Sequence, residues 1–372
     1  MTLHKGALAG LSVVEFTGLG PAPLAGQLLA DHGATVTVID RKPDKANLAE
    51  INRRGKRSVC LDLKSELGLD AARRLIAAND VLIEGFRPGV MERLGLGPQH
   101  CPDTLIYARM TGWGQTGPLA QTAGHDLNYL ALTGALHMMG AGDQPPMPPL
   151  NLVADFGGGT MFLLFGIMAA LFERQNSGKG QVIDAAMCEG VPAMMGLLHQ
   201  WQAQGTWSTN REANMLDGGA PFNRCYACSD GGFMSVACLE PQFFAEFIRL
   251  SGRDPKECAT QNDRATWPEM RAQYAQMFAG KTRDEWTAIF DGSDACVTPV
   301  LTFAEASQHP HNQARGTFID PNGVSQAAPA PALSRSKAPD VKSPTPPGAH
   351  SAEILEALGF SLDQIDQMMI TP

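Results

Sequence analysis

The chain has 372 residues, of which 44% are hydrophobic and 18% are charged, and its formal net charge is -9. This length is enough for two domains or for one large domain with an insertion, and the acidic balance argues against nucleic acid as a general partner. The longest apolar run, Met161 to Phe172, is shorter than the roughly 20 residues that span a bilayer, so we expect a buried core helix there.

Neither end of the chain resembles a secretory or peroxisomal targeting signal. Met1 to Gly6 lacks the apolar core and cleavage pattern of a signal peptide. The final residues, Met369 to Pro372, differ from a peroxisomal Ser-Lys-Leu signal. We therefore expect a cytoplasmic protein.

The first half of the chain alternates strands with helices. Apolar, β-branched segments predict strands, and the amphipathic segments between them predict helices. The expected strands are 11–16, 35–39, 58–63, 81–86 and 105–110, and the expected helices are 23–30, 67–78 and a short one ending at Leu94. Such alternation predicts a mostly parallel, doubly wound sheet, in which ligands bind beyond the carboxyl ends of the strands.

The loop after the first strand resembles part of a dinucleotide-binding fingerprint. Gly18 and Gly20 follow the strand, and Asp40 lies 20 residues beyond Gly20. Pro23 stands where the fingerprint has its third glycine, and a proline there changes the close packing of helix on strand. The sequence therefore argues against NAD binding. Asp40 is expected to have a structural role. Its neighbour Arg41 is the more interesting residue for ligand binding.

Two groups of cations suggest an anionic ligand. Five lie at or just after the ends of expected strands: Arg41, Lys64, Arg87, Arg93 and Arg109. Taken singly, each is more simply a solvated surface charge, but as a set at one sheet edge they favour phosphate binding. A second group also suits a small anion: Arg53, Arg54, Lys56 and Arg57.

Two further segments carry the candidate chemistry. His125 stands between a glycine and Asp126, and Asp155 precedes three glycines and the apolar run. An imidazole and a carboxyl on opposite sides of a carbon acid would form a proton-transfer site. The simpler interpretations are a helix N-cap for Asp155 and a structural role for His125. The glycines suit a helix start poorly, but they would let a ligand approach the backbone.

The second half of the chain has a different pattern. A helical connector is followed by a predicted β-hairpin over 224–238, then by helices starting at 240, 268 and 283. An extended strap rich in proline follows over 327–347, and short helices over 351–369 have Ser351 and Ser361 as expected caps. The expected domains are a large Rossmann-like domain over 1–187, a linker helix and loop over 188–224, a small α+β domain over 225–318, and a return segment with C-terminal helices over 319–372.

The eight cysteines are scattered at irregular spacing. Cys225 and Cys228 form a close pair, but no second pair accompanies them to complete a zinc site. Reduced thiols, and no metal, are the expectation.

A series of motifs carries a family resemblance. In chain order they are Gly117-Pro118, Gly124-His-Asp-Leu-Asn-Tyr129, Pro149-Leu-Asn-Leu-Val-Ala-Asp155-Phe-Gly-Gly, Gly178-Lys-Gly-Gln-Val-Ile-Asp184, Asn214-Met-Leu-Asp-Gly-Gly-Ala-Pro221, Glu240-Pro-Gln-Phe243 and Ser293-Asp-Ala-Cys-Val-Thr-Pro-Val300. Through them the chain resembles the α-methylacyl-CoA racemases of the family III CoA-transferase superfamily.

The resemblance implies an interlocked homodimer, with a Rossmann-like large domain and a small α+β domain in each chain. The active site would lie between the large domain of one subunit and the small domain of the other, and the large domain would hold coenzyme A. His125 and Asp155 match the two acid/bases, and Glu240 matches a supporting glutamate. The positions that match CoA contacts are Arg41, Leu61, Asp62, Leu63, Lys64, Gly85, Arg87, Arg93, Gly124, His125, Asp126, Leu127, Asn128 and Tyr129.

The implied activity is the interconversion of (R)- and (S)-2-methylacyl-CoA thioesters by 1,1-proton transfer through an enolate, without a cofactor beyond the CoA of the substrate. Backbone N–H groups near Gly157 and Gly158 would donate to the enolate oxygen. Transferases that move CoA between carboxylic acids keep the aspartate as a nucleophile but usually lack the histidine, so His125 favours the racemase. A non-catalytic acyl-CoA-binding protein is the third alternative, and the presence of both His125 and Asp155 argues against it.

Overall fold

The computed structural model describes residues 5–45 and 47–370. The chain forms two compact units: unit 1 comprises residues up to 133, 150–194 and 310 onward, and unit 2 comprises 134–149 and 195–309. These divisions fall at other residues than the boundaries expected at 187, 224 and 318. The two ends compared with targeting signals include Met1–His4 and residues 371–372. These residues lie outside the described part of the chain.

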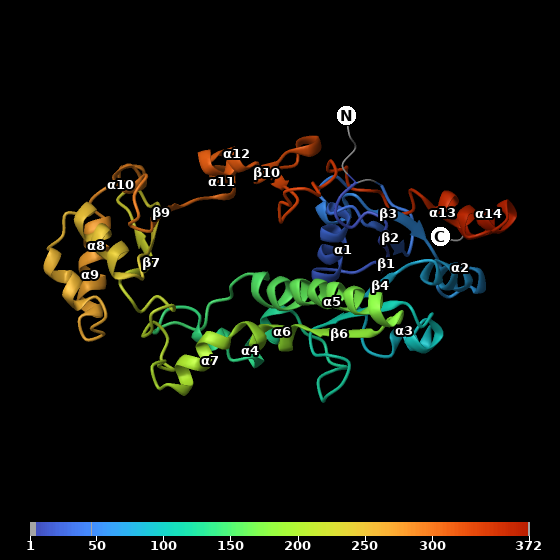
Figure 1. Cartoon of the computed structure of the whole chain (residues 1–372), viewed down its shortest axis with the longest axis horizontal. Helices are drawn as coiled ribbons and strands as arrows, with labels where there is room; N and C mark the ends of the chain where they lie inside the picture. The colour runs from blue at the N-terminus through green and yellow to red at the C-terminus, as the bar shows by residue number, and fades with distance from the viewer. Residues whose placement is uncertain (1–4, 46, 371–372) are drawn as a thin grey trace. The chain divides into compact units, whose positions relative to one another are not determined.

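Unit 1 is built on a six-stranded parallel sheet (Figure 1). The strands are β1 (Ser12–Phe16), β2 (Thr35–Asp40), β3 (Arg57–Cys60), β4 (Val81–Glu84), β5 (Ile106–Thr111) and β6 (Val182–Ala186), in the spatial order β3-β2-β1-β4-β5-β6. Strand order reverses between β1 and β4, and ligands of doubly wound sheets bind beyond the carboxyl ends at such a point. The expected α/β class and the five expected strands are confirmed.

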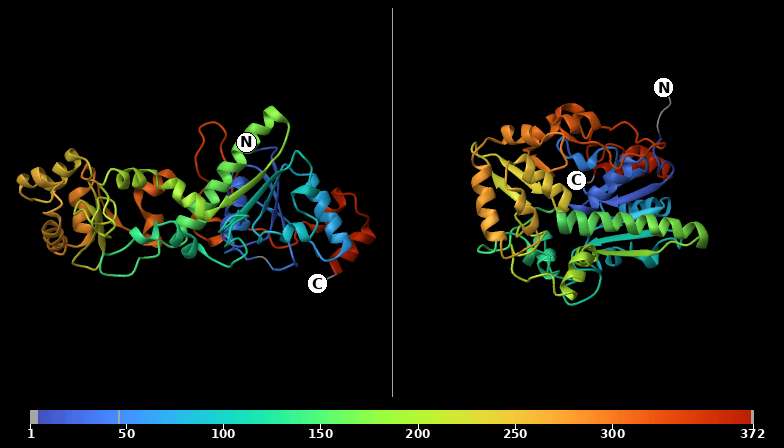
Figure 2. Two further views of the ribbon diagram at one scale, coloured as in Figure 1. Left: turned by 90° about the horizontal axis from the view of Figure 1, so that it is seen from below. Right: turned by 60° about the vertical axis from the view of Figure 1, so that its left-hand side comes forward.

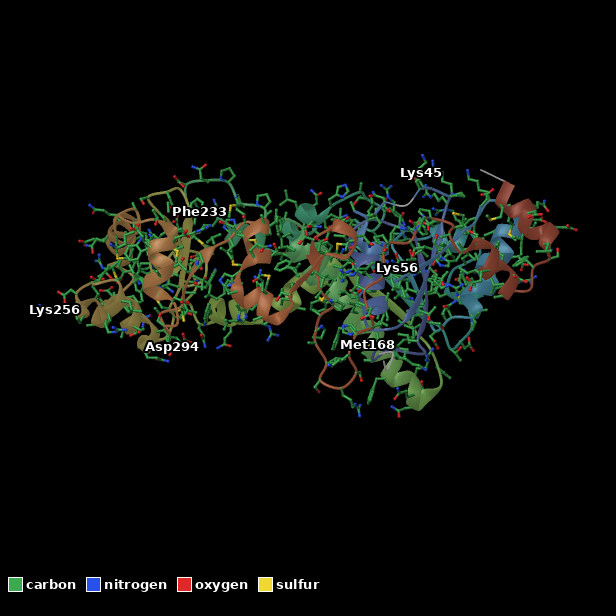
Figure 3. All side chains as sticks on the ribbon, turned by 90° about the horizontal axis from the view of Figure 1, so that it is seen from above. Lys45, Lys56, Met168, Phe233, Lys256 and Asp294 are labelled. Carbon is green, nitrogen blue, oxygen red and sulfur yellow. The ribbon has the colours of Figure 1, made fainter. Side chains whose placement is uncertain are left out.

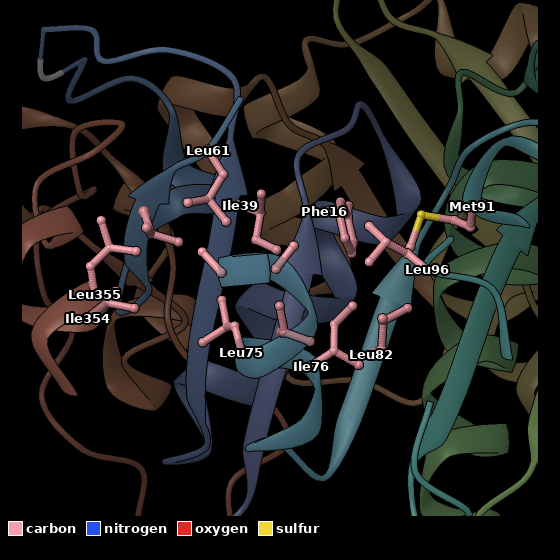
Figure 4. Packing of buried hydrophobic residues seen from close by; sticks show 14 of the residues in the cluster. Phe16, Ile39, Leu61, Leu75, Ile76, Leu82, Met91, Leu96, Ile354 and Leu355 are labelled. Carbon is pink, nitrogen blue, oxygen red and sulfur yellow. The ribbon is translucent and has the colours of Figure 1, made fainter. Parts of the chain in front are cut away.

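Helices cover both faces of this sheet. One face packs against α2 (Glu66–Ala77), α3 (Val90–Arg93) and the C-terminal helices α13 (Ser351–Ala357) and α14 (Leu362–Ile370). Phe16, Leu82 and Leu355 share one buried cluster in this layer (Figure 4). Figure 2 shows the red C-terminal helices beside the blue N-terminal elements. The other face carries α1 (Pro21–Asp31) and α5 (Phe162–Ser177).

The returning chain covers the edge strand β3. Gly348 donates its N–H to the Ser58 hydroxyl at 2.7 Å. The Ser351 hydroxyl accepts the N–H of Cys60 at 3.0 Å, and α13 begins at Ser351 itself, so this serine is not the expected cap. Ser361 does act as expected, because its hydroxyl accepts the N–H of Gln364 at 3.4 Å, in the first turn of α14.

The helix that contains the apolar run is longer than the sequence indicates. It runs for 26 residues, as a π-helix over Leu152–Met161 that continues into α5. In the described part of the chain it is the one helix long and apolar enough to cross a membrane by length and composition, and 33% of its most apolar window is buried. Ile167 is buried, but Phe165 and Phe172 are 73% and 70% exposed, so the expected core helix is buried on one side only.

Unit 2 contains a three-stranded antiparallel sheet of β7 (Asn223–Ala227), β8 (Phe233–Ala237) and β9 (Val297–Val300). Its helices are α7 (Gly196–Ala203), α8 (Pro241–Leu250), α9 (Trp267–Phe278), α10 (Arg283–Phe290) and α11 (Phe303–Gln308). Phe244, Phe247, Tyr274 and Phe278 lie in its core. The expected hairpin and α+β character are confirmed.

The remaining elements of unit 1 are short. They are α4 (Asp126–Leu132), α6 (Met187–Met194), α12 (Pro310–Arg315) and the hairpin of β10 (Phe318–Ile319) and β11 (Gln326–Ala327). The α4 and α6 helices both pack against the π-helix, and this group of three positions the candidate site.

Candidate active site

Asp126 joins the two segments that carry the candidate acid/bases. It is the first residue of α4, directly after His125. Its buried carboxylate accepts, through Oδ2, the N–H of Ala154 at 3.0 Å and the N–H of Asp155 at 2.8 Å. First-turn N–H groups have no partner within their own helix. One side chain therefore links the start of α4, whose N-cap residue is His125, to the first turn of the π-helix that contains Asp155.

Asp155 does not occupy the helix position that the sequence suggests. Asn151 is the N-cap residue, and Asp155 is the fourth residue of the π-helix. The glycines that follow lie inside this helix, where a β-carbon on Gly158 would come within 2.9 Å of the Val191 nitrogen in α6. They allow close packing on α6. The expectation that Gly157 and Gly158 offer N–H groups at a helix N-terminus is therefore wrong.

The surroundings of Asp155 favour its protonated form. Burial raises the pKa of its carboxyl above the ordinary value, and the negative charge of Asp126 raises it further. A hydrogen bond from the Asn151 side chain and the charge of His125 oppose this rise. His125, which is exposed, thus lies within electrostatic range of Asp155. A carboxyl that holds its proton more readily suits a general acid.

A buried tyrosine fixes the loop before α4. The hydroxyl of Tyr129 donates a hydrogen bond to the carbonyl of Gly124, and its ring meets Trp113 edge to face at 4.8 Å. A β-carbon at Gly112 would fall within 1.9 Å of the Tyr129 ring, so that glycine is needed for the ring to pack. The N–H of His125 donates to the side chain of Asn128 at 3.1 Å. The first turn of α4 therefore holds both Gly124 and His125 in the preceding loop.

The loop between β1 and α1 approaches the carboxyl of Asp155 through Gly20. A β-carbon at Gly20 would stand 3.5 Å from its Oδ2, and Gly20 has φ of 70°. Gly18 and Gly20 also line a pocket of about 560 Å³, whose wall includes Thr17 and Arg53. Gly20 therefore lies between this pocket and a candidate acid. The proximity of Gly20 to Asp155 could not be read from the sequence, although the glycine pair itself was visible.

The CoA-contact positions gather at the carboxyl edge of the sheet. Leu61–Lys64 follow β3, Arg41 follows β2, and Gly85 and Arg87 follow β4. Four cations of this region are exposed and have no carboxylate partner among the described residues: Arg41, Lys64, Arg87 and Arg93. The charge of Arg87 reaches Tyr129, where it lowers the pKa of the hydroxyl against the larger effect of burial. The carboxyl edge of the sheet with these four cations, here called the phosphate edge, therefore lies within electrostatic range of the helix that follows His125.

Arg109 does not belong to this group of free cations. It is buried, its guanidinium contacts Glu92 at 2.5 Å, and Glu84 lies 3.5 Å away. Its expected role in phosphate binding is therefore wrong.

The basic cluster over residues 53–57 is also engaged within the fold. Its four ion pairs are Arg53–Asp40 at 2.7 Å, Arg54–Asp31 at 2.6 Å, Lys56–Glu15 at 2.6 Å and Arg57–Glu353 at 2.8 Å. Figure 3 shows Lys56 inside unit 1, whereas Lys45 lies at its surface. These four cations are paired within the fold, so the expectation that they bind a small anion is wrong. The structural role expected of Asp40 is confirmed, because its carboxylate pairs with Arg53.

Glu240 lies in unit 2, as the exposed N-cap residue of α8. Its contact with His125 stays a prediction. Cys225 and Cys228 carry free thiols, and within residues 5–45 and 47–370 no three His, Cys, Asp or Glu side chains form a group that could hold a metal ion.

Comparisons with known proteins identify the family. The model described as CoA-transferase family III matches residues 8–351. The chain is 48% identical to α-methylacyl-CoA racemase of Mus musculus over 366 residues, covering 97% of this chain and 96% of that protein. It is also 48% identical to α-methylacyl-CoA racemase of Homo sapiens over 368 residues, with the same two coverages. A crystal structure of a CAIB/BAIF family protein from Brucella suis, 28% identical, matches with a TM-score of 0.80 over 95% of this chain and 100% of that one. The chain therefore belongs to CoA-transferase family III.

Proposed function

We propose that the chain is a racemase that interconverts (R)- and (S)-2-methylacyl-CoA thioesters. The observation that carries the proposal is that Asp126, the residue after His125, accepts the N–H of Asp155 at 2.8 Å, in the unit that also holds the four exposed cations beyond the sheet. The near full-length similarity to two proteins named α-methylacyl-CoA racemase supports it.

The mechanism follows from the weak acidity of the carbon next to a thioester. One base removes the α-proton from one face, and an acid returns a proton to the other face of the planar enolate. His125 takes the proton of one epimer, by family analogy (S), while Asp155 in its acid form protonates the opposite face. In the reverse direction the two exchange roles. The raised pKa of Asp155 supports this assignment, because the acid form must be present when His125 is the base.

The substrate brings its own coenzyme A, and no other cofactor enters the proposed reaction. Arg41, Lys64, Arg87 and Arg93 would hold its phosphates, because they are exposed and unpaired among the described residues. Glu240 would orient His125.

The runner-up function is a CoA-transferase in which Asp155 attacks the thioester. The family name favours this alternative. A transferase of this kind needs a nucleophilic carboxylate but no second base, whereas proton transfer on two faces needs both groups. His125, directly before Asp126, which accepts the N–H of Asp155, therefore favours proton transfer.

The decisive experiment uses one epimer of a 2-methylacyl-CoA in deuterated water without added cofactor. A racemase incorporates one deuterium at the α-carbon while the substrate loses its stereochemical purity. Acyl exchange with an added carboxylic acid, without deuterium incorporation, would establish the transferase. Binding of the thioester with neither reaction would establish a non-catalytic binding protein.

We also infer a homodimer, whose partner covers the exposed side of α5. Phe165 and Phe172 of α5 are 73% and 70% exposed, and Met161, just before this helix, is 45% exposed; such patches mark contact surfaces. Sedimentation should give a dimer that the double variant Phe165→Glu, Phe172→Glu converts to a monomer.

The exposed apolar side chains of α5 could instead contact a membrane, and flotation with lipid vesicles tests this alternative. Cell fractionation tests the proposed cytoplasmic location.

A further inference from the structure

We infer that Asp126 is a positioning residue, whose carboxylate sets both the placement of Asp155 relative to His125 and the charge environment of the pair. The inference rests on the proposed racemisation and assigns Asp126 a role beyond contact with CoA.

The placement follows from three connections. Asp126 is covalently next to His125, and one of its carboxylate oxygens accepts the N–H groups of both Ala154 and Asp155, at 3.0 and 2.8 Å. The side chain is 8% exposed, so it has little freedom to release either bond. A displacement of this carboxylate would move the π-helix relative to the start of α4, and with it the gap in which an α-carbon must sit.

The second carboxylate oxygen of Asp126 accounts for the electrostatic effect of this residue on Asp155. Oδ1 is buried and has no hydrogen-bond partner within the residues that the structure describes. Buried polar atoms are usually paired, and an unpaired carboxylate oxygen leaves a charge whose effect falls on its neighbours. The neighbour is Asp155, whose pKa Asp126 raises by more than any other charge does.

The charges around Asp155 can be assigned element by element. Asp126 and His125, at the start of α4, act on its carboxyl, and Tyr129 of the same helix responds to the charge of Asp155. Gly20 approaches it from the β1–α1 loop without a charge. The titratable groups on the other elements packed against the π-helix are Asp31 of α1, Glu173 and Arg174 of α5, Tyr107 and Arg109 of β5, Asp184 of β6, and Cys188 and Glu189 of α6.

Asp126→Asn tests the electrostatic part, because the amide oxygen can still accept both N–H groups while the charge is lost. A pair that exchanges one proton works only when it holds a single proton, so the acidic limb of kcat/KM reports its more acidic member, ordinarily the aspartate. Loss of the Asp126 charge should move this limb to lower pH. It should also lower kcat/KM about threefold to tenfold for both epimers, since a less available proton slows either direction equally.

The control is Asp254→Asn, which alters an aspartate that accepts a first-turn N–H in unit 2, at 3.0 Å from Lys256. It should leave both the rate and the pH profile unchanged. An Asp126→Asn profile identical to that of the wild type would overturn the inference. Absence of deuterium incorporation in the wild-type protein would instead overturn the proposed racemisation itself.

Asp126→Glu serves as the second variant if the asparagine variant does not fold. It keeps the charge but lengthens the side chain, so the acidic limb should stay near its wild-type position. kcat should fall at least tenfold through displacement of Asp155, while KM changes less. A shifted limb with unchanged kcat would contradict the inference.

Discussion

Gly190 of α6 lies directly against the carbonyl of Gly158 in the π-helix, so closely that a β-carbon on Gly190 would come within 1.9 Å of that oxygen. Backbone cannot yield as a flexible side chain can. Gly190→Ala should therefore lower the free energy of unfolding by about 2–3 kcal/mol, measured in urea. It should also reduce racemisation, because the displaced helix carries Asp155.

The matched control for this substitution is Gly196→Ala, at the start of α7, where an added β-carbon meets nothing within 4 Å. Its stability should change by no more than about 1 kcal/mol, in the stabilising direction. Equal stability of the two variants would show that the contact between Gly158 and Gly190 does not limit the packing.

Arg54 and Arg87 should respond to substitution in opposite ways. Arg54 and Asp31 contact each other at 2.6 Å with both side chains 3% exposed, so Arg54→Ala leaves a buried carboxylate unpaired. That should cost about 3–5 kcal/mol of stability. Arg87 is exposed, and Arg87→Ala should change stability by less than about 0.5 kcal/mol.

The same two variants separate folding from ligand binding. Arg87→Ala should raise the KM for the CoA ester about tenfold, with a smaller effect at high salt because exposed charges are screened. Unfolding curves and initial rates at two ionic strengths measure both quantities. An unchanged KM in Arg87→Ala would remove this arginine from the phosphate edge.

Glu84 should give the protein a pH-dependent stability. Burial raises its pKa from 4.5 to about 7, against a hydrogen bond from the Phe86 N–H and the charge of Arg109. Because the folded-state pKa lies above the unfolded one, its stabilising contribution is complete below 4.5 and is lost as the pH rises through about 7. Glu84→Gln does not titrate, so it should gain about 2–3 kcal/mol relative to the wild type over this interval.

The measurement is the difference in unfolding free energy between Glu84→Gln and the wild type, taken on both sides of this interval. Taking the difference from the wild-type free energy of unfolding cancels the contribution of all other titrating groups. The assignment would be contradicted if this difference did not change with pH, or if the variant became less stable relative to the wild type as the pH rises.

Local patterns predicted the elements well, because strand and helix periodicities are properties of neighbouring residues. The partners of charged side chains were not predictable in this way. Arg57 pairs with Glu353 from the far end of the chain, so a run of cations that suggested an anion site is neutralised by tertiary contacts. The same reason explains the error at Asp155: the acceptor at the helix start comes from Asp126, 29 residues earlier.

The π-helical form of Leu152–Met161 was equally beyond sequence periodicity. Its hydrogen-bond ladder differs from that of an α-helix, but its apolar residues follow a similar spacing. The candidate residues themselves were visible because His125 and Asp155 stand in distinctive motifs. Asp126 was visible beside His125, but the sequence could not show that its carboxylate connects the two segments.

His125 and Asp155 should show mirrored stereochemical defects if each serves one face of the substrate. His125→Ala should lose deuterium incorporation from the (S) epimer by about 10²- to 10⁴-fold, and Asp155→Ala should do the same for the (R) epimer. Racemisation in both directions should fail in either variant, because each direction needs both groups. Binding of the CoA ester should change far less, since neither substitution removes one of the exposed arginines or the lysine proposed to hold the phosphates.

His100→Ala is the matched control, because His100 is also an exposed histidine of unit 1. It should retain incorporation from both epimers. The double variant of His125 and Asp155 should racemise no more slowly than either single variant, since residues that act as a unit are not additive. Incorporation that survives fully in His125→Ala would remove the imidazole from the reaction. Loss from both epimers in one variant alone would assign both faces to a single base and would contradict the proposal that the two groups serve opposite faces.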